Sequence, residues 1–211
     1  MTDEILTTFD VQGKVTGTAP RDEVHRYGHW HETFHCWFVE QREGSLYIYL
    51  QLRSKDKRDY AGLLDITAAG HLLANETARD GLREVEEELG LQLAFDELIP
   101  LGVIPYSMVK EGMIDNERAN VFLYDNHFSL EQFRLQPEEV EGIVISEFAS
   151  FRKFWQGALE QLEVSGFRVT DSGERIAVQE AVDLSHFVPH DTAYYLQIIA
   201  GVEQAFGQVH G

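Results

Sequence analysis

Short segments of alternating or continuous apolar residues predict most of the strands of this chain. The stretches 33–39 (TFHCWFV) and 45–53 (SLYIYLQLR) are rich in β-branched and aromatic residues, and EQREG between them suggests a hairpin loop. Further strands are predicted over 63–70, 97–109, 118–126 and 139–148. The segment 13–20 (GKVTGTAP) predicts a turn-rich entry, because glycine and proline favour turns.

Three segments show the apolar periodicity of helices. These segments are 77–89, 149–164 and 192–207. In the first, Leu82, Val85 and Leu89 form an apolar edge that predicts packing on a sheet, and Gly90 is a plausible stop. Asp191 is a plausible N-cap of the third. Strands around one central helix, followed by terminal helices, predict an α/β or α+β sandwich.

Composition and charge narrow the class of protein. The chain has 211 residues, 44% of them apolar, which is enough for one sizeable core. A net charge of −19 repels a nucleic-acid backbone, so no duplex partner is expected, although a metal ion can bridge an anionic protein and a phosphorylated small molecule. No apolar run predicts a membrane span. A single cysteine and an N-terminus without a basic stretch lead us to expect a cytoplasmic protein.

The segment 82–90 (LREVEEELG) places four glutamates in nine positions. At about 100° per residue, Glu84, Glu87 and Glu88 share one helix face. Glu86 points the other way. Like charges four residues apart destabilise a helix by roughly 0.2–0.5 kcal/mol, and a hard divalent cation would reverse that effect because it prefers carboxylate oxygens. A solvated acidic surface is the alternative that these residues leave open.

The surrounding residues resemble the signature box of the Nudix hydrolase superfamily, G-x5-E-x7-R-E-U-x-E-E-x-G-U with U aliphatic. Gly70, five residues and Glu76 match its start, and residues 83–91 match its second half throughout. One departure is that six residues, rather than seven, separate Glu76 from Arg83. A loop one residue shorter is therefore expected ahead of the helix, and the role of Glu76 stays open.

The resemblance implies a fold and a set of roles. Nudix proteins form an α/β/α sandwich with a mixed sheet, so we expect a single Nudix domain over 1–211, with a core at about 8–150 and a C-terminal helical extension over about 147–211. The residues that match family metal ligands, for Mg²⁺ or Mn²⁺, are Glu84, Glu87 and Glu88, with Gly70 lending a backbone carbonyl. Arg83 matches the arginine that braces the glutamates. The implied reaction is metal-assisted hydrolysis of a diphosphate.

A second cluster of candidate ligands lies near the N-terminus. Residues 23–35 (EVHRYGHWHETFH) contain four histidines, of which His29, His31 and His35 would share one face of an extended segment. Surface or core histidines remain the alternative. The order of segments over about 8–150 resembles the Nudix branch of the type 1 isopentenyl-diphosphate isomerases and their bacterial relatives. The residues that match the metal ligands of that branch are His25, His31, His71, Asp115 and Glu117.

This mixed set of ligands favours particular metals, and it differs from the pattern of the isomerase branch at two points. Imidazole with carboxylate suits Mn²⁺ or Zn²⁺ better than Mg²⁺. Asp115 replaces a glutamate, and His25 and His31 are one residue closer together than in the isomerases. If no second metal binds, Asp115 and Glu117 are expected to serve the box metals or to supply a general base.

The same resemblance argues against isomerase chemistry. An isomerase needs a cysteine acid/base in the segment that matches TAAGH, where this chain has Ala68 and Ala69. Cys36, its one cysteine, lies on a predicted strand beside Trp37 and is predicted to be core. Diphosphate hydrolysis needs no such thiol.

The segment 53–58 (RSKDKR) concentrates positive charge ahead of the box. Its basic residues, Arg53, Lys55, Lys57 and Arg58, are candidate phosphate ligands, as the matching segment is in the isomerase branch, although a solubilising loop would look the same. Side chains that would line either a substrate pocket or the core are Phe34, Trp37, Tyr60, Tyr106 and Met108.

Together these patterns predict a metal-dependent Nudix pyrophosphohydrolase that cleaves a diphosphate linkage in a nucleoside diphosphate derivative or a similar small molecule. The residues expected to act in catalysis are Glu84, Glu87, Arg83 and Glu117. The alternatives are an enzyme like isopentenyl-diphosphate isomerase and a non-catalytic Nudix sensor of a nucleotide or diphosphate. The C-terminal segments FRKFW and YYLQII suit either a homodimer face or packing on the sheet.

Overall fold

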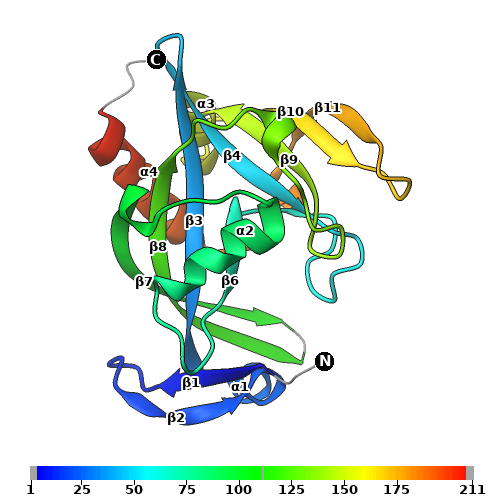
Figure 1. The fold of residues 1–211 in the computed structure, drawn as a ribbon. Helices are drawn as coiled ribbons and strands as arrows, with labels where there is room; N and C mark the ends of the chain where they lie inside the picture. Colours follow the sequence, from blue (N-terminus) through cyan, green and yellow to red (C-terminus); the bar gives the residue numbers. More distant parts are fainter. Residues whose placement is uncertain (1–3, 111, 208–211) are drawn as a thin grey trace.

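The computed structural model describes residues 4–110 and 112–207, which form a mixed sheet with helices on both faces (Figure 1). In chain order the elements are β1 (Ile5–Phe9), β2 (Val15–Pro20), α1 (Arg21–Tyr27), β3 (Trp30–Arg42), β4 (Ser45–Arg53), β5 (Leu64–Asp65), β6 (Ala68–His71), α2 (Arg83–Leu89), β7 (Leu98–Lys110), β8 (Met113–Asp125), β9 (Val140–Glu147), α3 (Phe148–Trp155), β10 (Leu162–Val169), β11 (Arg175–Val182) and α4 (Thr192–Phe206). The predicted sandwich is confirmed.

The sheet is built around β3. Its strand order is β11-β10-β9-β4-β3-β1-β2, while β8 lies parallel to β3 and pairs with β7 on its other side. Successive side chains of β3 alternate between the faces. Phe34 and Phe38 share a core cluster with Val85 of α2. Trp37 and Val39 belong to a second cluster, which α3 and α4 complete on the opposite face (Figure 1).

The hairpin of β3 and β4 divides the sheet into two branches. The two strands pair only where residues 39–42 face residues 45–48. Beyond that point β4 pairs with β5 and β9, whereas β3 pairs with β6 and β8. The gap between the branches lets side chains from both faces of the sheet meet.

The central helix is shorter than predicted. It begins at Arg83, not Thr77, because the Asp80 carboxylate accepts hydrogen bonds from the Thr77 amide (2.8 Å) and hydroxyl (2.7 Å) and holds a turn that leads into a single 3₁₀ turn. Gly90 ends the helix in the left-handed conformation, at φ 67°, as expected of a C-cap. Val85 of the predicted apolar edge is fully buried.

Two other predictions of local structure are wrong. Residues 13–20 are not a turn-rich entry, because Val15–Pro20 form β2 and pair with β1 at the sheet edge, where glycine and proline are tolerated. The helix expected over 149–164 ends at Trp155. Gly157 adopts a left-handed φ of 74°, and the residues from Leu162 onward form β10, which pairs with β9 and β11. The C-terminal extension therefore contains a hairpin as well as helices.

The last helix, α4, packs against the sheet, which is one of the two arrangements predicted for the C-terminal segments. The Asp191 carboxylate caps it by accepting a hydrogen bond from the Ala193 amide at 2.9 Å. Tyr194, Tyr195 and Ile198 are buried in the core cluster of Trp37. In the described residues no helix is long and apolar enough to cross a membrane.

We expect Asp191→Ala to destabilise the protein by about 1 kcal/mol, because it leaves the first amides of α4 without their side-chain acceptor. The measurement is the urea midpoint of unfolding, with Thr192→Ala as the control, since Thr192 is exposed at the next position. Equal midpoints for the two variants would show that the cap does not stabilise α4.

Candidate active site

A cavity of about 300 Å³ lies between the two branches of the sheet. Arg53 and Asp65 line it from the β4–β5 branch, and Thr33 and Gly70 from the β3–β6 branch. The helix α2 adds carboxylates, and the segment ahead of α4 adds His190. Residues far apart in the sequence therefore share one polar cavity.

The three box glutamates that were predicted to share a face all line this cavity. Glu88 is buried and accepts a hydrogen bond from the Ala69 amide at 3.2 Å. Glu84 lies directly over Gly70, where an added Cβ would come within 2.2 Å of the Glu84 carboxylate. Only glycine leaves room for that approach. Glu87 is the most exposed of the three, with 53% of its side chain accessible.

Arg83 holds this acidic group together. Its guanidinium forms ion pairs with Glu84 (2.7 Å) and Glu87 (3.0 Å). It also donates to the Glu76 carboxylate at 2.7 and 3.1 Å and to the His71 carbonyl at 3.1 Å. Glu76, whose role the shortened spacing left open, therefore anchors Arg83 and also accepts from the Leu73 amide at 2.8 Å.

Burial dominates the electrostatics of the box carboxylates. It raises the pKa of Glu84 to about 7, despite the nearby positive charge of Arg83. Burial, with the adjacent charge of Glu84, also raises the pKa of Glu88 well above its usual range. Both carboxyls therefore ionise less readily than an exposed glutamate unless a cation approaches them.

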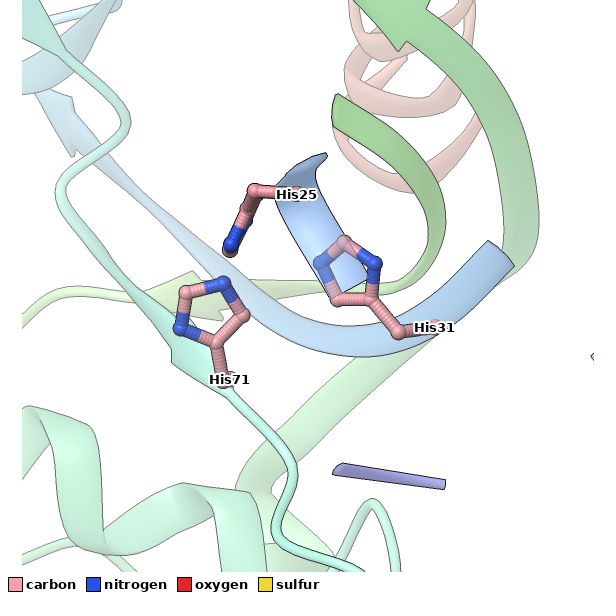
Figure 2. Close-up of side chains that lie close together, drawn as sticks. All are labelled: His25, His31 and His71. Carbon is pink, nitrogen blue, oxygen red and sulfur yellow. The ribbon is translucent and has the colours of Figure 1, made fainter. Parts of the chain in front are cut away.

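His25, His31 and His71 form a second group, brought together from α1, β3 and β6 (Figure 2). Their ring centroids lie 5.1–5.2 Å apart. Each of the three rings offers one nitrogen, and these three nitrogens lie within 4.8 Å of one another. The same is true of one possible ligand atom from each of His31, Asp115 and Glu117. The five residues that the sequence grouped are thus adjacent in space.

The ring nitrogens of this group are oriented by the backbone. Nδ1 of His25 lies 2.8 Å from the Arg21 carbonyl, and Nδ1 of His31 lies 3.1 Å from the His29 carbonyl. Both Nε2 atoms then lie 3.5 Å from Oδ1 of Asp115. Among the residues that the structure describes, His31 Nε2 and Asp115 Oδ1 are buried without a hydrogen-bond partner. Burial also lowers the pKa of His71 well below its usual range, which keeps that ring neutral.

Strand register explains the surroundings of Glu117. It lies opposite His31 across the parallel pair with β3 and opposite Tyr106 across the antiparallel pair with β7. Its Oε2 atom accepts from the Tyr106 hydroxyl (2.6 Å) and the Thr33 hydroxyl (2.8 Å), and His35 Nε2 lies 3.1 Å from it. Burial alone would raise the pKa of Glu117, but the neighbouring His35, His31 and Tyr106 outweigh it and hold the pKa well below its usual range.

The predicted phosphate ligands separate into two pairs. Arg53 and Lys57 line the cavity, where Arg53 pairs with Asp65 at 2.8 Å and Lys57 pairs with Glu139. In the part of the chain that is described, Arg53 Nε is buried and has no hydrogen-bond partner. Lys55 and Arg58 lie outside the cavity lining. They form ion pairs with Asp171 and Asp22 on the surface instead.

The five side chains predicted to line either a pocket or the core divide between the two. Tyr60, Tyr106 and Met108 line the cavity, whereas Phe34 and Trp37 are fully buried in the core. Cys36 is fully buried as predicted, and burial raises its pKa far above the usual value for a thiol. Ala69, which lines the cavity, occupies the region where an isomerase would need its cysteine.

Sequence reasoning missed the contribution of the C-terminal extension to the cavity. His190 lines it, and its Nε2 lies 2.8 Å from Oδ1 of Asp65. His35, which was grouped only by its position in the strand, bridges Glu117 and Tyr194 of α4 through its two nitrogens. His190 and Tyr194 have no spacing relation to the box, so only the folded chain reveals their proximity.

Comparison with known proteins establishes the family. No protein-family model matches the chain. An uncharacterised Nudix hydrolase of Clostridium acetobutylicum is 33% identical over 195 residues, which cover 92% of this chain and 95% of the relative. The chain belongs to the Nudix hydrolase superfamily.

This Nudix protein also resembles an isomerase in sequence and a crystal structure in fold. An isopentenyl-diphosphate delta-isomerase of Mycolicibacterium vanbaalenii is 28% identical over 123 residues, which cover 57% of this chain and 66% of the isomerase. The crystal structure of a Deinococcus radiodurans protein has the same fold, with a TM-score of 0.51 and 19% identity over 66% of this chain and 81% of that protein. The predicted family and fold are confirmed.

The divalent ions that the Nudix family implies fit the residues present here. The box offers three carboxylates with one bracing arginine, and burial disfavours the charged forms of Glu84 and Glu88 unless a cation compensates. Within the described ranges, His31 Nε2 and Asp115 Oδ1 are buried without hydrogen-bond partners, and a ring nitrogen and a carboxylate oxygen are donors that a divalent cation accepts. Both groups therefore have the donor chemistry of divalent metal sites.

We expect Glu84→Gln to stabilise the metal-free Nudix protein at pH 8. A carboxyl whose folded-state pKa is raised from 4.5 to about 7 keeps its proton when the unfolded chain has lost it. The free energy of unfolding of the wild type therefore falls as the pH rises from 4.5 to about 7. Above pH 7 this loss of stability is complete and stays constant. A pKa change of this size corresponds to about 3 kcal/mol.

The measurement is thermal unfolding in a chelator at pH 5 and pH 8. The stabilisation by Glu84→Gln should be small at pH 5 and larger at pH 8. Glu86→Gln removes a charge from the exposed side of the same helix and is the matched control. If Glu84→Gln is no more stable than the wild type at pH 8, burial does not destabilise the ionised Glu84 carboxylate.

Proposed function

We propose that this chain is a metal-dependent hydrolase that cleaves a diphosphate linkage in a nucleoside diphosphate derivative or a similar small molecule. The observation that carries the proposal is the single cavity in which box carboxylates, a histidine–carboxylate cluster and the cations Arg53 and Lys57 meet. Carboxylates suit divalent cations, and the two basic side chains suit phosphate oxygens.

The roles follow from the geometry. Glu84, Glu87 and Glu88 would hold Mg²⁺ or Mn²⁺, with Gly70 leaving space for the Glu84 carboxylate. Divalent ions bound there would neutralise the diphosphate and lower the pKa of the attacking water. Arg83 keeps the glutamates in one orientation. Arg53 and Lys57 would orient the phosphates, since both line the cavity and Arg53 Nε lacks a partner among the described residues.

A second cation would bind at the histidine cluster. Its proposed ligands are His25, His31, His71, Asp115 and Glu117, and this mixed set favours Mn²⁺ or Zn²⁺ over Mg²⁺. The backbone carbonyls that bond His25 and His31 through Nδ1 are typical orienting partners of metal-binding histidines. Glu117, or Glu87 at the exposed end of the box, would take the proton from water.

The cavity favours hydrolysis over allylic isomerisation. Isomerisation needs a group that protonates an alkene carbon, and the thiol of Cys36 is sealed in the core while Ala69 lines the cavity. The intact carboxylates favour an enzyme over a non-catalytic sensor.

A release assay for phosphate and nucleoside monophosphate tests the proposal. Nucleoside diphosphate derivatives and prenyl diphosphates would be supplied with Mg²⁺, with Mn²⁺ and with chelator. We expect hydrolysis of at least one compound with metal and none with chelator. Metal-dependent binding without turnover would identify a sensor, and interconversion of allylic isomers would identify an isomerase, so either result would overturn the proposal.

We expect Glu87→Gln to lower kcat by about 100-fold or more while the fold survives, because it removes a metal ligand from a half-exposed position. Glu86→Gln on the same helix should retain activity, since Glu86 bonds Gln92 outside the cavity. Circular dichroism checks the fold of both variants. Wild-type turnover by Glu87→Gln would remove Glu87 from the metal site.

His25→Ala tests the second metal site. We expect the bound Mn²⁺ per chain, measured by elemental analysis after dialysis, to fall by about one ion, because the variant loses one of five converging ligands. His29→Ala is the control, since its side chain lies outside the cluster. An unchanged stoichiometry in His25→Ala would exclude the second site.

A further inference from the structure

We propose that Tyr194, supplied by the C-terminal helix α4, is a positioning residue for Glu117. It would act by fixing the tautomer of His35, so that the ring donates a hydrogen bond to the Thr33 hydroxyl, which in turn donates to Oε2 of Glu117 and holds that carboxylate in one orientation for a cation. This inference rests on the proposed histidine-cluster metal site and extends it to the C-terminal extension.

The first step is the hydrogen bonding of the Tyr194 hydroxyl. Trp37 Nε1 lies 3.1 Å from it and can only donate. His35 Nδ1 lies 2.8 Å from it. Within the described residues these two are the hydrogen-bond partners of this buried hydroxyl, so its hydrogen has one acceptor available, the lone pair of His35 Nδ1.

The second step follows from the two nitrogens of a neutral imidazole. If Nδ1 accepts, the ring hydrogen is on Nε2. That atom lies 3.1 Å from Glu117 Oε2 and 3.2 Å from the Thr33 hydroxyl oxygen. The Thr33 hydroxyl gives its own hydrogen to Glu117 Oε2 at 2.8 Å, so its oxygen accepts from His35 Nε2. With the ring hydrogen on Nδ1, the lone pair of Nε2 would face the Thr33 and Glu117 oxygens, and the Tyr194 hydrogen would lack an acceptor.

The third step concerns the Glu117 carboxylate. Thr33 and Tyr106 both donate to Oε2, from β3 on one side and β7 on the other, and the His35 ring donates to Thr33 beside the same oxygen. These contacts on one oxygen restrict the rotation of the carboxylate. Glu117 is thereby held in place beside His31 and Asp115. A ligand held in this way needs no reorganisation when a cation arrives.

Two adjacent tyrosines of α4 provide a matched comparison. Tyr194 and Tyr195 are both buried. The Tyr195 hydroxyl donates to the Val188 carbonyl at 3.3 Å and its ring stacks on Trp155. Replacing either tyrosine by phenylalanine removes one buried hydroxyl, but only Tyr194→Phe breaks the connection to His35.

The first measurement is the tautomer of His35 in the metal-free protein at pH 8, from long-range ¹H–¹⁵N correlations of the histidine rings. The His35 signals are assigned by their loss in His35→Gln. We expect hydrogen on Nε2 alone in the wild type and in Tyr195→Phe, and a mixture of tautomers in Tyr194→Phe. Hydrogen on Nδ1 in the wild type, or an unchanged tautomer in Tyr194→Phe, would overturn the proposal.

The second measurement is Mn²⁺ affinity by calorimetry. It uses the Glu87→Gln background, in which the box site is weakened and the histidine cluster dominates binding. We expect Tyr194→Phe to weaken binding by about 10-fold, the lower end for orienting partners of metal ligands, and Tyr195→Phe by less than about twofold. Equal losses in the two variants would mean that Tyr194 acts only through packing.

A double substitution separates positioning from packing. Glutamine at position 35 has no imidazole ring, so no tautomer remains for Tyr194 to fix. In the His35→Gln background, Tyr194→Phe should therefore change Mn²⁺ affinity by less than about twofold, whereas a packing role would lower it as much as before. If the Glu87→Gln background binds no Mn²⁺, the second metal site fails, and the tautomer measurement still decides the role of Tyr194.

Discussion

Glu84 and Glu88 extend from one turn of α2 into a cavity where burial favours their neutral forms, and of the two only Glu84 forms an ion pair with Arg83 among the described residues. This uncompensated acidity is the constraint on which the site depends. A charge in a poorly solvated place must be paired or lose its charge. Arg83 is itself held by Glu76 and a backbone carbonyl, so it orients the carboxylates without fully neutralising them. The box is therefore poised for a cation.

The shape of the sheet brings the glutamates of α2 close to the histidines of β3. The helix α2 packs on one face, while His31, Thr33 and His35 alternate with the residues beneath it and point to the other face. Two sets on opposite faces of a continuous sheet would stay apart. Because β3 and β4 separate after a short paired region, both sets reach the same cavity.

Local patterns predicted the parts of the site that local geometry determines. Helical periodicity places three glutamates on one face and Val85 on another, and a helix imposes that arrangement wherever it lies. The loop after Arg53 was less predictable, because the direction of Lys55 and Arg58 depends on distant partners such as Asp171. His190 and Tyr194 were invisible for the same reason: their neighbours in the cavity are more than a hundred residues earlier in the chain. The strand β10 was missed for a different reason: its backbone hydrogen bonds come from β9 and β11, and the pattern of its own segment does not show that pairing.

The alternation along β3 limits how this protein can evolve. One strand carries His31, Thr33 and His35 at odd positions and core side chains such as Phe34 and Phe38 at even ones. A single-residue insertion or deletion between positions 31 and 38 would exchange the two sets, bury imidazoles under α2 and expose phenylalanine in the cavity. Substitutions can accumulate in this strand one at a time, but its length cannot drift. Length variation among descendants of this sequence should instead gather in the exposed turns, such as the one between β10 and β11.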